Sequence, residues 1–600
     1  MATTITPQTA RKGASFLFEE STPQEIFTRE DLTDEHLAVG RMVEEFWTNE
    51  VEPNLPAIRA KKPGVALEVL RKSAPLGLLG ISVPEKFGGM AMDLPSVMIV
   101  AEVMGRDASY AGWHSAHTGI GSLPILFFGT EQQKQKYLPR LVQGELLAAY
   151  ALTEPLAGSD ALAARTRADL SADGKHYILN GQKMWITNGG AADLFTVFAK
   201  VGGEKFTAFL VERAFGGLTS GAEEHKMGIT GSSTTAIYFD NVKVPVENVL
   251  GEIGRGHVIA FNILNIGRLK LGPAVMGAAK NILSISIKYA KQRKAFGSSI
   301  ANFGAIQHKL AEMAIRIFAA ESMAWRVVGL IETQLSSDAH NTSNKNDSAK
   351  AELKAVEEYA AECSMVKVFA AEMLDYVADE GVQIHGGYGF HQDYAVERYY
   401  RDARINRLFE GTSEINRLVI SGMPLKRAAR GELALLEAAR KTLHEAASSL
   451  NSSYEGSDQE ESSNQETMLV HHAKKVALLM LGVADAKYGA TLEKQQEVVM
   501  NLSDIFMEVF AMESVLLRTQ KTAASEKKAT ATEICAVFLR DALTRIQNSA
   551  QTVLAACCEG NNLEQYESIL RSLARYKAVN TIALRRTIAE NLLSSERYIF

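Results

Sequence analysis

Apolar residues in the first part of the chain recur at intervals of three to four positions. Val39, Met42, Val43 and Phe46 follow this spacing, and residues so spaced lie on one face of an α-helix. The periodicity continues, punctuated by proline and glycine, to about residue 144. The pattern predicts a helical N-terminal part with a buried face.

Between about residues 150 and 250 the pattern changes to short apolar and β-branched runs. The runs 195–201 and 206–211 flank Gly202-Gly203, and an earlier run meets Asn180-Gly181. Both dipeptides are typical of tight hairpin turns. The sequence therefore predicts a middle β domain with a hairpin at each of these two dipeptides.

Helical periodicity returns from Gly256 to about Arg430 and again from Met468 to Phe600. Two polar interruptions, 336–348 and 448–465, are typical of an exposed loop and a flexible linker. The fold class is therefore predicted as mainly α with a central β domain. The expected domains are an N-terminal helical domain (1–149), the middle β domain (150–255), a helical bundle (256–430) and an additional α-helical domain (431–600).

Composition limits the class of protein. An apolar fraction of 46% with 22% charged residues is ordinary for a globular protein. A net charge of −6 without a basic stripe argues against a nucleic-acid partner. Cys363, Cys535, Cys557 and Cys558 show no metal-ligand spacing, and the adjacent pair makes a poor disulfide. We therefore expect no metal and a reducing compartment.

Targeting signals are not evident in the sequence. No apolar run approaches the ~20 residues of a membrane-spanning helix; a long run near the C-terminal region is 476–484. The N-terminus lacks a charged segment followed by an apolar one, and Glu19 and Glu20 argue against a transit peptide. A cytoplasmic location is the expectation.

Glu410 is the strongest candidate for a chemical role. It follows Leu408-Phe409 and precedes Gly411. Apolar neighbours would raise the pKa of its carboxyl group toward neutrality, and the glycine lets a substrate approach the backbone. Glu410 is thus a candidate general base, although the same residues also fit the start of a surface turn between two helices.

Four further segments, together with the one around Glu410, resemble the motifs of the acyl-CoA dehydrogenase family, in the family's order, from about Asp34 to Leu425. They are 150–160 (YALTEPLAGSD), 183–189 (KMWITNG), 293–297 (RKAFG) followed by Gln307, and 383–389 (QIHGGYG). Each alone also fits an ordinary turn, a core strand or a helix end. The family usually has glycine where Leu156 stands.

The resemblance implies FAD as the cofactor. Trp185 would cover one face of the flavin ring, Thr187 would hydrogen-bond near N5, and Arg293 would meet the pyrophosphate. The glycine-rich segment 383–389 would reach the FAD of the other subunit of a homodimer. The residues implied in FAD contacts are Tyr150, Leu152, Thr153, Gly158, Ser159, Trp185, Ile186, Thr187, Arg293, Phe296, Phe303, Gln307, Gln383, Gly386, Gly387, Thr412 and Glu414.

The resemblance also implies the reaction. Glu410 would remove the α-proton of a fatty acyl-CoA thioester while the β-hydride passes to flavin N5, and the Glu410 N–H and a ribityl hydroxyl would stabilise the enolate oxygen. Some family members place the base immediately before an arginine, but here Gly267 precedes Arg268. The residues implied in substrate contacts are Ser159, Asn265, Arg268, Phe409 and Gly411.

Chain-length preference is less directly encoded. Gly112, Ala116 and Gly119 would either leave a deep tunnel for the acyl chain or permit close helix packing. The additional helical domain resembles that of very-long-chain members, which favours long substrates. Lys474-Lys475, beside an apolar run, would either touch lipid in a weak peripheral contact or belong to a buried helix.

The resulting hypothesis is a homodimeric, FAD-dependent long-chain acyl-CoA dehydrogenase of fatty acid β-oxidation that forms trans-2-enoyl-CoA. Its expected electron acceptor is the electron-transferring flavoprotein. Two alternatives are an acyl-CoA oxidase, which shares base and flavin but passes electrons to oxygen, and an assembly or scaffold protein that retains the fold.

Overall fold

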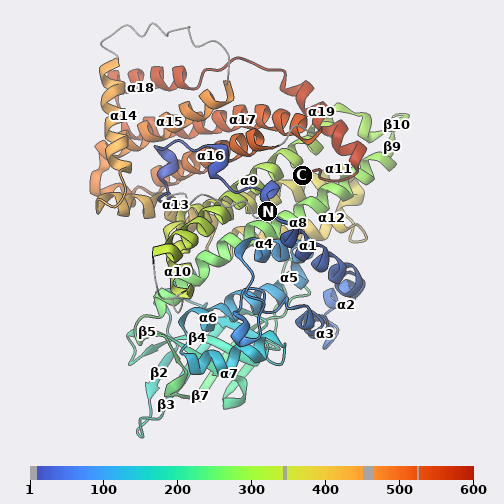
Figure 1. Ribbon diagram of the computed structural model, residues 1–600, viewed down its shortest axis with the longest axis vertical. Helices are drawn as coiled ribbons and strands as arrows, with labels where there is room; N and C mark the ends of the chain where they lie inside the picture. Colours follow the sequence, from blue (N-terminus) through green and yellow to red (C-terminus); the bar gives the residue numbers. More distant parts are fainter. Residues whose placement is uncertain (1–9, 342–347, 450–464, 523–525) are drawn as a thin grey trace.

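The protein was analysed as a computed structural model that describes residues 10–341, 348–449, 465–522 and 526–600. The elements form three tiers (Figure 1). The β-sheet and the N-terminal helices lie at one end, the long helices of a bundle lie in the middle, and the last helices form the other end. Both ends of the described chain lie near the centre.

The N-terminal region is helical, as the apolar periodicity predicts. In α1 (Asp34–Phe46) the buried positions include Val39, Val43 and Phe46. Thr33 caps the start of this helix, where its side chain accepts a hydrogen bond from the His36 N–H. The other helices are α2 (Leu55–Arg59), α3 (Val65–Lys72), α4 (Leu94–Met104), α5 (Ala108–Ser115), the π-helical turn η8 (Ala116–Gly121), α6 (Leu123–Phe128) and α7 (Glu131–Val142).

The middle region is the predicted β domain. In the described part of the chain it forms an eight-stranded sheet of order β6-β7-β3-β2-β4-β5-β8, with β1 paired parallel to β4. The strands are β1 (Ala148–Ala151), β2 (Arg167–Leu170), β3 (His176–Thr187), β4 (Leu194–Val201), β5 (Lys205–Glu212), β6 (Leu218–Glu223), β7 (Thr234–Pro245) and β8 (Val249–Leu250).

Of the two predicted hairpins, the one at Gly202-Gly203 is confirmed. Strands β4 and β5 pair antiparallel on either side of it, and the two glycines have φ of 59° and 81°. Three residues connect the paired Val201 and Lys205, and the Glu204 N–H donates to the Val201 carbonyl at 3.3 Å. A turn whose central residues both have positive φ matches the twist of the strands it joins.

The hairpin predicted at Asn180-Gly181 is wrong. Strand β3 continues through both residues and pairs with β7 on either side, with a shift in register between Leu179 and Gly181. The Asn241 N–H on β7 donates to Asn180 Oδ1 at 2.8 Å. The conformational freedom of the dipeptide thus produces an irregularity within one long strand instead of a chain reversal.

The helical bundle is built on α8 (Gly256–Gln292), α9 (Gly304–Asn341) and α11 (Ala360–His385), with α10 (Ser348–Glu358), α12 (Ala395–Ala403) and α13 (Ser413–Ala429) around them. Helix α9 includes the first part of the predicted loop 336–348, so that prediction is wrong up to Asn341. Polar residues at an exposed helix end cost only tenths of a kcal/mol each, which explains the continuation. Residues 342–347 lie outside the described part.

The last tier contains α14 (Leu435–Ser449), α15 (Gln465–Tyr488), α16 (Gln496–Lys521), α17 (Glu526–Cys557), α18 (Gly560–Leu573) and α19 (Thr581–Ser595). Residues 450–464, most of the predicted linker, lie outside the described part. Lys474 on α15 is 3% exposed, and its Nζ lies 2.6 Å from Glu513 Oε1. Lys474 and the apolar run beside it are therefore packed inside the molecule, as the buried-helix alternative predicts. Lys475 is exposed, so a weak peripheral membrane contact stays a prediction.

Two helical segments, Gly256–Gln292 and Gln465–Lys494, are long and apolar enough to cross a membrane by length and composition alone. The most apolar stretch of each is 56% and 67% buried within the protein, respectively. Core helices pass the same test, so this observation is weak evidence for a membrane span.

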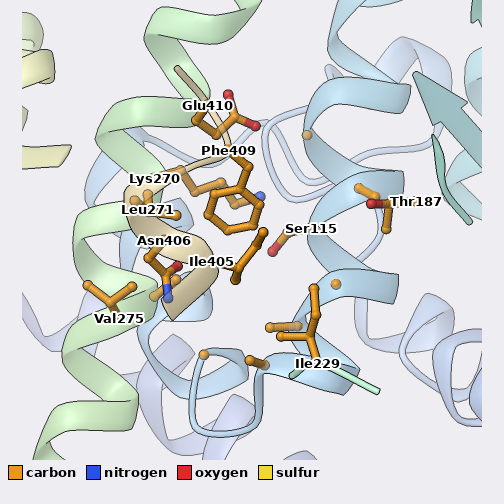
Figure 2. A pocket seen from close by; sticks show the side chains of 18 of the residues that line it. Ser115, Thr187, Ile229, Lys270, Leu271, Val275, Ile405, Asn406, Phe409 and Glu410 are labelled. Carbon is orange, nitrogen blue, oxygen red and sulfur yellow. The ribbon is translucent and has the colours of Figure 1, made fainter. Parts of the chain in front are cut away.

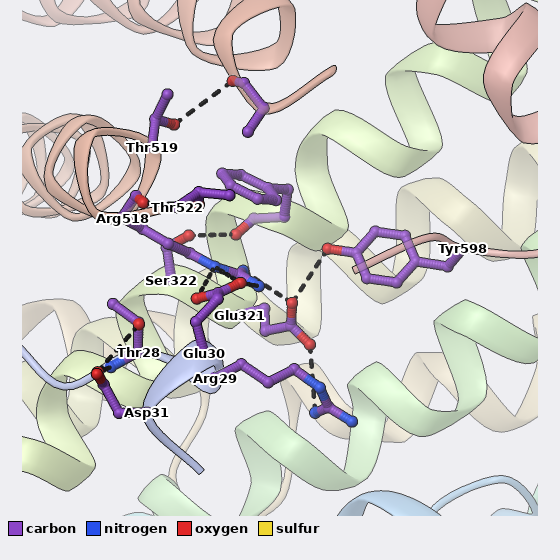
Figure 3. A network of polar contacts seen from close by, with 12 residues as sticks. Thr28, Arg29, Glu30, Asp31, Glu321, Ser322, Arg518, Thr519, Thr522 and Tyr598 are labelled. Atoms are coloured by element: carbon purple, nitrogen blue, oxygen red, sulfur yellow. Dashed lines mark hydrogen bonds and ion pairs between the residues drawn. The ribbon is translucent and has the colours of Figure 1, made fainter. Parts of the chain in front are cut away.

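A buried network of charges joins the three parts of the chain (Figure 3). The guanidinium of Arg518 on α16 pairs with Glu30 of the N-terminal segment and with Glu321 of α9, both at 2.8 Å. The Tyr598 hydroxyl, close to the end of the chain, donates to Glu321 Oε2 at 3.1 Å. The last tier is thus fixed to the bundle by paired charges as well as by apolar packing.

Candidate active site

Glu410 lies in the short connection between the helical turn η15 (Arg404–Arg407) and α13. Thr412 ends this connection, where its Oγ1 accepts a hydrogen bond from the Ile415 N–H at 3.2 Å and caps α13. Glu410 has φ of 56° and Gly411 has φ of 82°. Left-handed backbone is costly for a residue with a side chain, so this conformation needs support from its surroundings.

That support comes from three buried side chains that bind the carbonyl groups of the connection. Arg268 Nε donates to the Glu410 carbonyl at 3.3 Å, and Lys367 Nζ donates to the Gly411 carbonyl at 2.7 Å. Asn416 Nδ2 donates to the same Gly411 carbonyl at 2.8 Å. The two cations thus hold the backbone without pairing directly with the Glu410 carboxylate.

The Glu410 carboxylate is left unpaired. Its Oε2 is buried and has no hydrogen-bond partner among the residues that the structure describes. Burial raises the pKa of Glu410 to about 7, even though the nearby charges of Arg268 and Lys367 lower it. A carboxylate with that pKa exchanges a proton readily at neutral pH, as a general base requires.

Space for this carboxylate is created by Gly267 on α8. A Cβ atom at residue 267 would lie 2.7 Å from Glu410 Oε2 and 3.0 Å from Cδ, closer than such atoms can approach. Residues 267 and 410 therefore face each other across the site, and only one of them can carry a large side chain.

A cavity of about 190 Å³ opens at Glu410 (Figure 2). Small and aliphatic side chains dominate its walls, which come from α5, η8, α8 and the segment 399–410. A Cβ at Gly112 would meet Ser232 at 2.9 Å, whereas one at Gly119 would have only Lys270 Nζ nearby, at 3.9 Å. Gly112 thus permits close packing and Gly119 leaves open space, so both alternatives for the small residues apply.

The first two motif segments meet Glu410 at this cavity. Thr187, at the end of β3, lines it together with Glu410. The Tyr150 hydroxyl on β1 is buried without a partner in the described chain, and its pKa is raised by burial and by the negative charge of Glu410. Trp185 is 61% exposed with φ of 57°, so its ring is free to cover a planar ligand.

The remaining residues of these two motifs divide into exposed and buried positions. Gly158 and Ser159 are exposed, and nothing lies within 4 Å of a Cβ built at Gly158. Leu152 and Ile186 are buried in the core, so their backbone groups rather than their side chains are available to a ligand. The Thr153 carbonyl accepts a hydrogen bond from the Met184 N–H at 2.9 Å, which joins the two motifs.

The third and fourth motif segments form a second group. The Arg293 guanidinium lies 5.5 Å from the centre of the Tyr388 ring, and the rings of Phe296 and Phe303 are 6.1 Å apart. Phe296 is 96% exposed. Gln383, Gly386 and Gly387 are also exposed, whereas Gln307 donates to the Ala301 carbonyl at 3.1 Å.

The two groups lie far apart in one chain. Gly267, beside Glu410, and Gln292, beside Arg293, are both on α8, and 25 residues of helix span about 37 Å. Figure 1 shows the same separation, with the sheet at one end and β9 (Lys294–Ala295) and β10 (Ser298–Ser299) at the other side. One chain thus presents two distinct sets of candidate cofactor contacts.

The candidate substrate residues lie at the base of the site. Arg268 and Asn265 are buried, and Arg268 Nη1 donates to Asn265 Oδ1 at 2.8 Å. Phe409 lines the cavity, and Gly411 continues the Glu410 backbone. Glu414 is exposed in the first turn of α13, where hydrogen bonds from its own backbone N–H and from the Thr412 side chain lower its pKa.

Sequence reasoning missed Lys367, Asn416 and Lys270. Lys367 and Asn416 hold the carbonyl groups of the Glu410 connection. Lys367 lies on α11, too far from Glu410 in the sequence for a local pattern to reveal it, whereas Asn416 is a polar residue only five positions after Gly411. Lys270 lines the cavity. The sequence could have indicated Lys270, because it is a charged residue three positions after Gly267, on a face of the helix that is otherwise apolar.

Comparison with known proteins extends these observations. Models of the family described as acyl-CoA dehydrogenase match the chain four times: the N-terminal domain at 33–145, the middle domain at 149–242, and two C-terminal domains at 254–422 and 472–572. A probable acyl-CoA dehydrogenase of Bacillus subtilis is 46% identical over 98% of both chains.

A more distant relative and a solved structure also belong to the acyl-CoA dehydrogenases. The human mitochondrial very long-chain specific acyl-CoA dehydrogenase is 35% identical over 84% of this chain and 78% of its own length. A crystal structure of acyl-CoA dehydrogenase complexed with FAD from Bacillus anthracis superposes with a TM-score of 0.93 at 46% identity, covering 98% of this chain and 100% of that one. The four-domain match and the full-length similarity show that this chain belongs to the acyl-CoA dehydrogenase family.

Proposed function

We propose that the protein is an FAD-dependent dehydrogenase that converts long-chain fatty acyl-CoA to trans-2-enoyl-CoA in fatty acid β-oxidation. The observation that carries this proposal is the unpaired, buried Glu410 carboxylate at a deep apolar cavity, next to Tyr150 and Thr187 of the flavin motifs. The residues present fit FAD: the Tyr150 hydroxyl, near Glu410, has no hydrogen-bond partner in the described part of the chain, and the exposed Trp185 ring is free to cover the flavin.

Glu410 performs the proton transfer. With a pKa of about 7 its carboxylate removes the α-proton of the thioester, and a bound acyl chain excludes water from the apolar cavity. The Glu410 N–H makes no hydrogen bond within the described chain and is available to the developing enolate oxygen. FAD, when bound, supplies the two-electron oxidation.

Arg268 and Lys367 position this base. Their hydrogen bonds to the Glu410 and Gly411 carbonyl groups fix the left-handed backbone and so the direction of the carboxylate. Because both cations point at backbone oxygens, they lower the pKa of Glu410 less than direct ion pairs would. Asn265 and Arg268 would lie on the CoA side of the thioester, with Ser159, Phe409 and Gly411 around it.

The depth of the cavity supports a long acyl chain. Its lining residues on α8 extend from Ile263 to Ala278, which is about 22 Å along the helix. The facing walls are lined largely by small residues, at Gly105, Ala108, Ala111, Gly112, Ala116 and Gly119, which leaves room along this length.

The separated motif groups support a homodimer. Thr153, Gly158, Ser159, Trp185 and Thr187 would bind the flavin end of one FAD, while Arg293, Phe296, Phe303, Gln307, Gln383, Gly386 and Gly387 of the partner would reach its distal end. The domain division at residues 149, 255 and 430, the cytoplasmic location and the electron-transferring flavoprotein as acceptor stay predictions.

Oxidation of palmitoyl-CoA by the purified flavoprotein tests the reaction. We expect turnover with electron-transferring flavoprotein or a dye as acceptor, accompanied by bleaching of the flavin absorbance and little peroxide. Peroxide formed one-to-one with enoyl-CoA would instead assign an oxidase. Bound FAD without any turnover would favour the scaffold alternative.

A further inference from the structure

The cavity beside Glu410 contains a positive charge that the proposed reaction does not use. Lys270 on α8 lines the cavity three residues after Gly267, so its Cα lies about 4.5 Å farther along the helix. Figure 2 shows the Lys270 nitrogen directed into the space beside Phe409, with the Ser115 hydroxyl also directed inward from the facing helix.

Lys270 has little compensation for its charge. Among the described residues, the one hydrogen bond of its Nζ goes to Thr118 Oγ1, at 3.2 Å. The Thr118 hydroxyl gives its own proton to the His114 carbonyl, at 2.9 Å, so it serves Lys270 only as an acceptor. Two N–H groups of the ammonium thus remain for another partner.

The carboxylates of the cavity do not neutralise Lys270. Asp402 accepts a hydrogen bond from the Ile229 N–H elsewhere in the wall, and neither Asp402 nor Glu410 forms an ion pair with Lys270 in the described chain. The neighbouring His114 and His117 are neutral, since burial, together with the charge of Lys270, lowers their pKa values to about 3 and about 4.

A buried ammonium without an anionic partner is unfavourable, and burial accordingly lowers the pKa of Lys270 to about 8. It still carries its charge at pH 7. In a cavity built for an alkyl chain, an apolar residue at this position would bind such a chain better. A charge kept at this cost is explained if the ligand brings the missing partner.

We propose that Lys270 and Thr118 form a polar subsite that binds an oxygen function on the acyl chain, and that the terminal carboxylate of a dicarboxylic acyl-CoA is the group it fits. This proposal rests on the proposed acyl-CoA dehydrogenation. The carboxylate would accept hydrogen bonds from Lys270 and neutralise it. Because Lys270 lies less than one helical turn beyond Gly267, the carboxylate would be borne a few carbons from the reacting bond, with deeper space left for longer chains.

Pairs of thioesters with equal chain length test the subsite. Dicarboxylic and monocarboxylic acyl-CoAs of six, eight, ten and twelve carbons would be compared by kcat/KM with the holoenzyme and with Lys270→Met, which keeps the length of the side chain and removes its charge. We expect the dicarboxylic-to-monocarboxylic ratio to fall at least tenfold in Lys270→Met for at least one chain length. The monocarboxylic rate should rise.

Two further variants separate charge from shape. Lys270→Arg should retain the ratio within about threefold, because it keeps the cation. Thr118→Val, which removes the acceptor, should shift the ratio by a smaller factor than Lys270→Met. Ratios within twofold of each other in wild type and Lys270→Met at every chain length would overturn the subsite.

Binding of the corresponding trans-2-enoyl-CoA pairs, measured by calorimetry, distinguishes failure of this proposal from failure of the proposed function. Tighter binding of the dicarboxylic enoyl-CoA that is lost in Lys270→Met supports the subsite even if no thioester is oxidised. If monocarboxylic substrates are oxidised rapidly but the two enoyl-CoAs of each pair bind equally well, the proposed dehydrogenase function stands and the proposed subsite is refuted.

Discussion

Glu410 and Gly267 share a single volume: the carboxylate of one fills the space that a Cβ on the other would need, with only 2.7 Å between that Cβ and Oε2. Gly267 is on α8 and Glu410 lies more than a hundred residues later. The position of the candidate base therefore depends on an absent side chain as much as on the residues that hold its backbone.

Replacing Gly267 with alanine should displace the Glu410 carboxylate. Misplacing a reacting group by a fraction of an ångström to 1 Å costs up to about a hundredfold in rate, so we expect kcat to fall ten- to a hundredfold in a steady-state assay. Gly422→Ala on α13 is the control, since nothing lies within 4 Å of its Cβ. Equal activity of Gly267→Ala and Gly422→Ala would contradict the assigned geometry.

The pH dependence of kcat/KM should report the Glu410 proton. Because the base must be ionised and burial raises its pKa to about 7, activity should rise with pH up to about 7 and fall tenfold per unit below it. Glu410→Gln should lose about 10²- to 10⁴-fold in rate while keeping FAD and the circular-dichroism spectrum. The control is Glu437→Gln, which changes an exposed acid on α14 and should behave as wild type. If the residual activity of Glu410→Gln still falls below pH 7 as in wild type, the titrating group is a residue other than Glu410.

Heterodimers test whether the FAD site is shared between subunits. Trp185→Glu removes one group of candidate contacts and Arg293→Glu removes the other, so each homodimer should lose FAD. In a shared site, a heterodimer of the two variants has one intact site and one doubly altered site. We therefore expect the purified heterodimer to contain about half of the wild-type flavin. If each site were instead built within one chain, both sites of the heterodimer would carry an altered residue and the heterodimer would contain no flavin.

Glu362 should make the protein less stable as pH rises. It is buried on α11, where its Oε1 accepts the Ala14 N–H, and burial raises its pKa from 4.5 to about 7. The unfolded chain therefore loses this proton first, and stability declines between about pH 4.5 and pH 7. Glu362→Gln should gain up to about 3 kcal/mol relative to wild type between pH 5 and pH 8, measured by urea denaturation; a pH-independent difference would exclude this role.

Arg518 should be essential for attachment of the last tier. Arg518→Met removes the buried cation shared by Glu30 and Glu321, although Glu321 keeps its pairs with Lys280 and Arg29. Removing one partner of a buried ion pair typically costs 3–5 kcal/mol, and we expect a loss of about 3 kcal/mol here. Arg571→Met breaks only an exposed pair with Glu567 at 3.5 Å and should cost about 0.5 kcal/mol or less. Thermal unfolding would compare the two, and similar losses would show that the network is not structurally required.

Local patterns were sufficient for much of the fold. The apolar face of α1 and the turn at Gly202-Gly203 follow from rules that act within a few residues, since side-chain period and left-handed glycines are local properties. The same rules failed at Asn180-Gly181, where the dipeptide fits both a turn and a strand irregularity. Pairing with β7 on both sides decided between them.

The candidate site shows the same division. Glu410 was recognisable because its neighbours in the sequence are apolar and small, which already predicts a raised pKa. Lys367, which helps to fix its backbone, and Gly267, which makes its space, belong to other helices much earlier in the chain, and no periodicity relates residues so far apart. Asn416 is only six residues from Glu410, but its role depends on its side chain turning back onto the connection, which the structure shows.

The sequence by itself thus determined the order of helical and β regions, the candidate base and the motif segments, because each depends on residues close together along the chain. Only the tertiary structure decided that the motif segments fall into two groups, separated by some tens of ångströms along the long helix α8, and that a lysine enters the apolar cavity. The reason is physical: burial, unpaired charge and excluded volume arise from distant residues brought into contact, and they do not exist until the chain has packed.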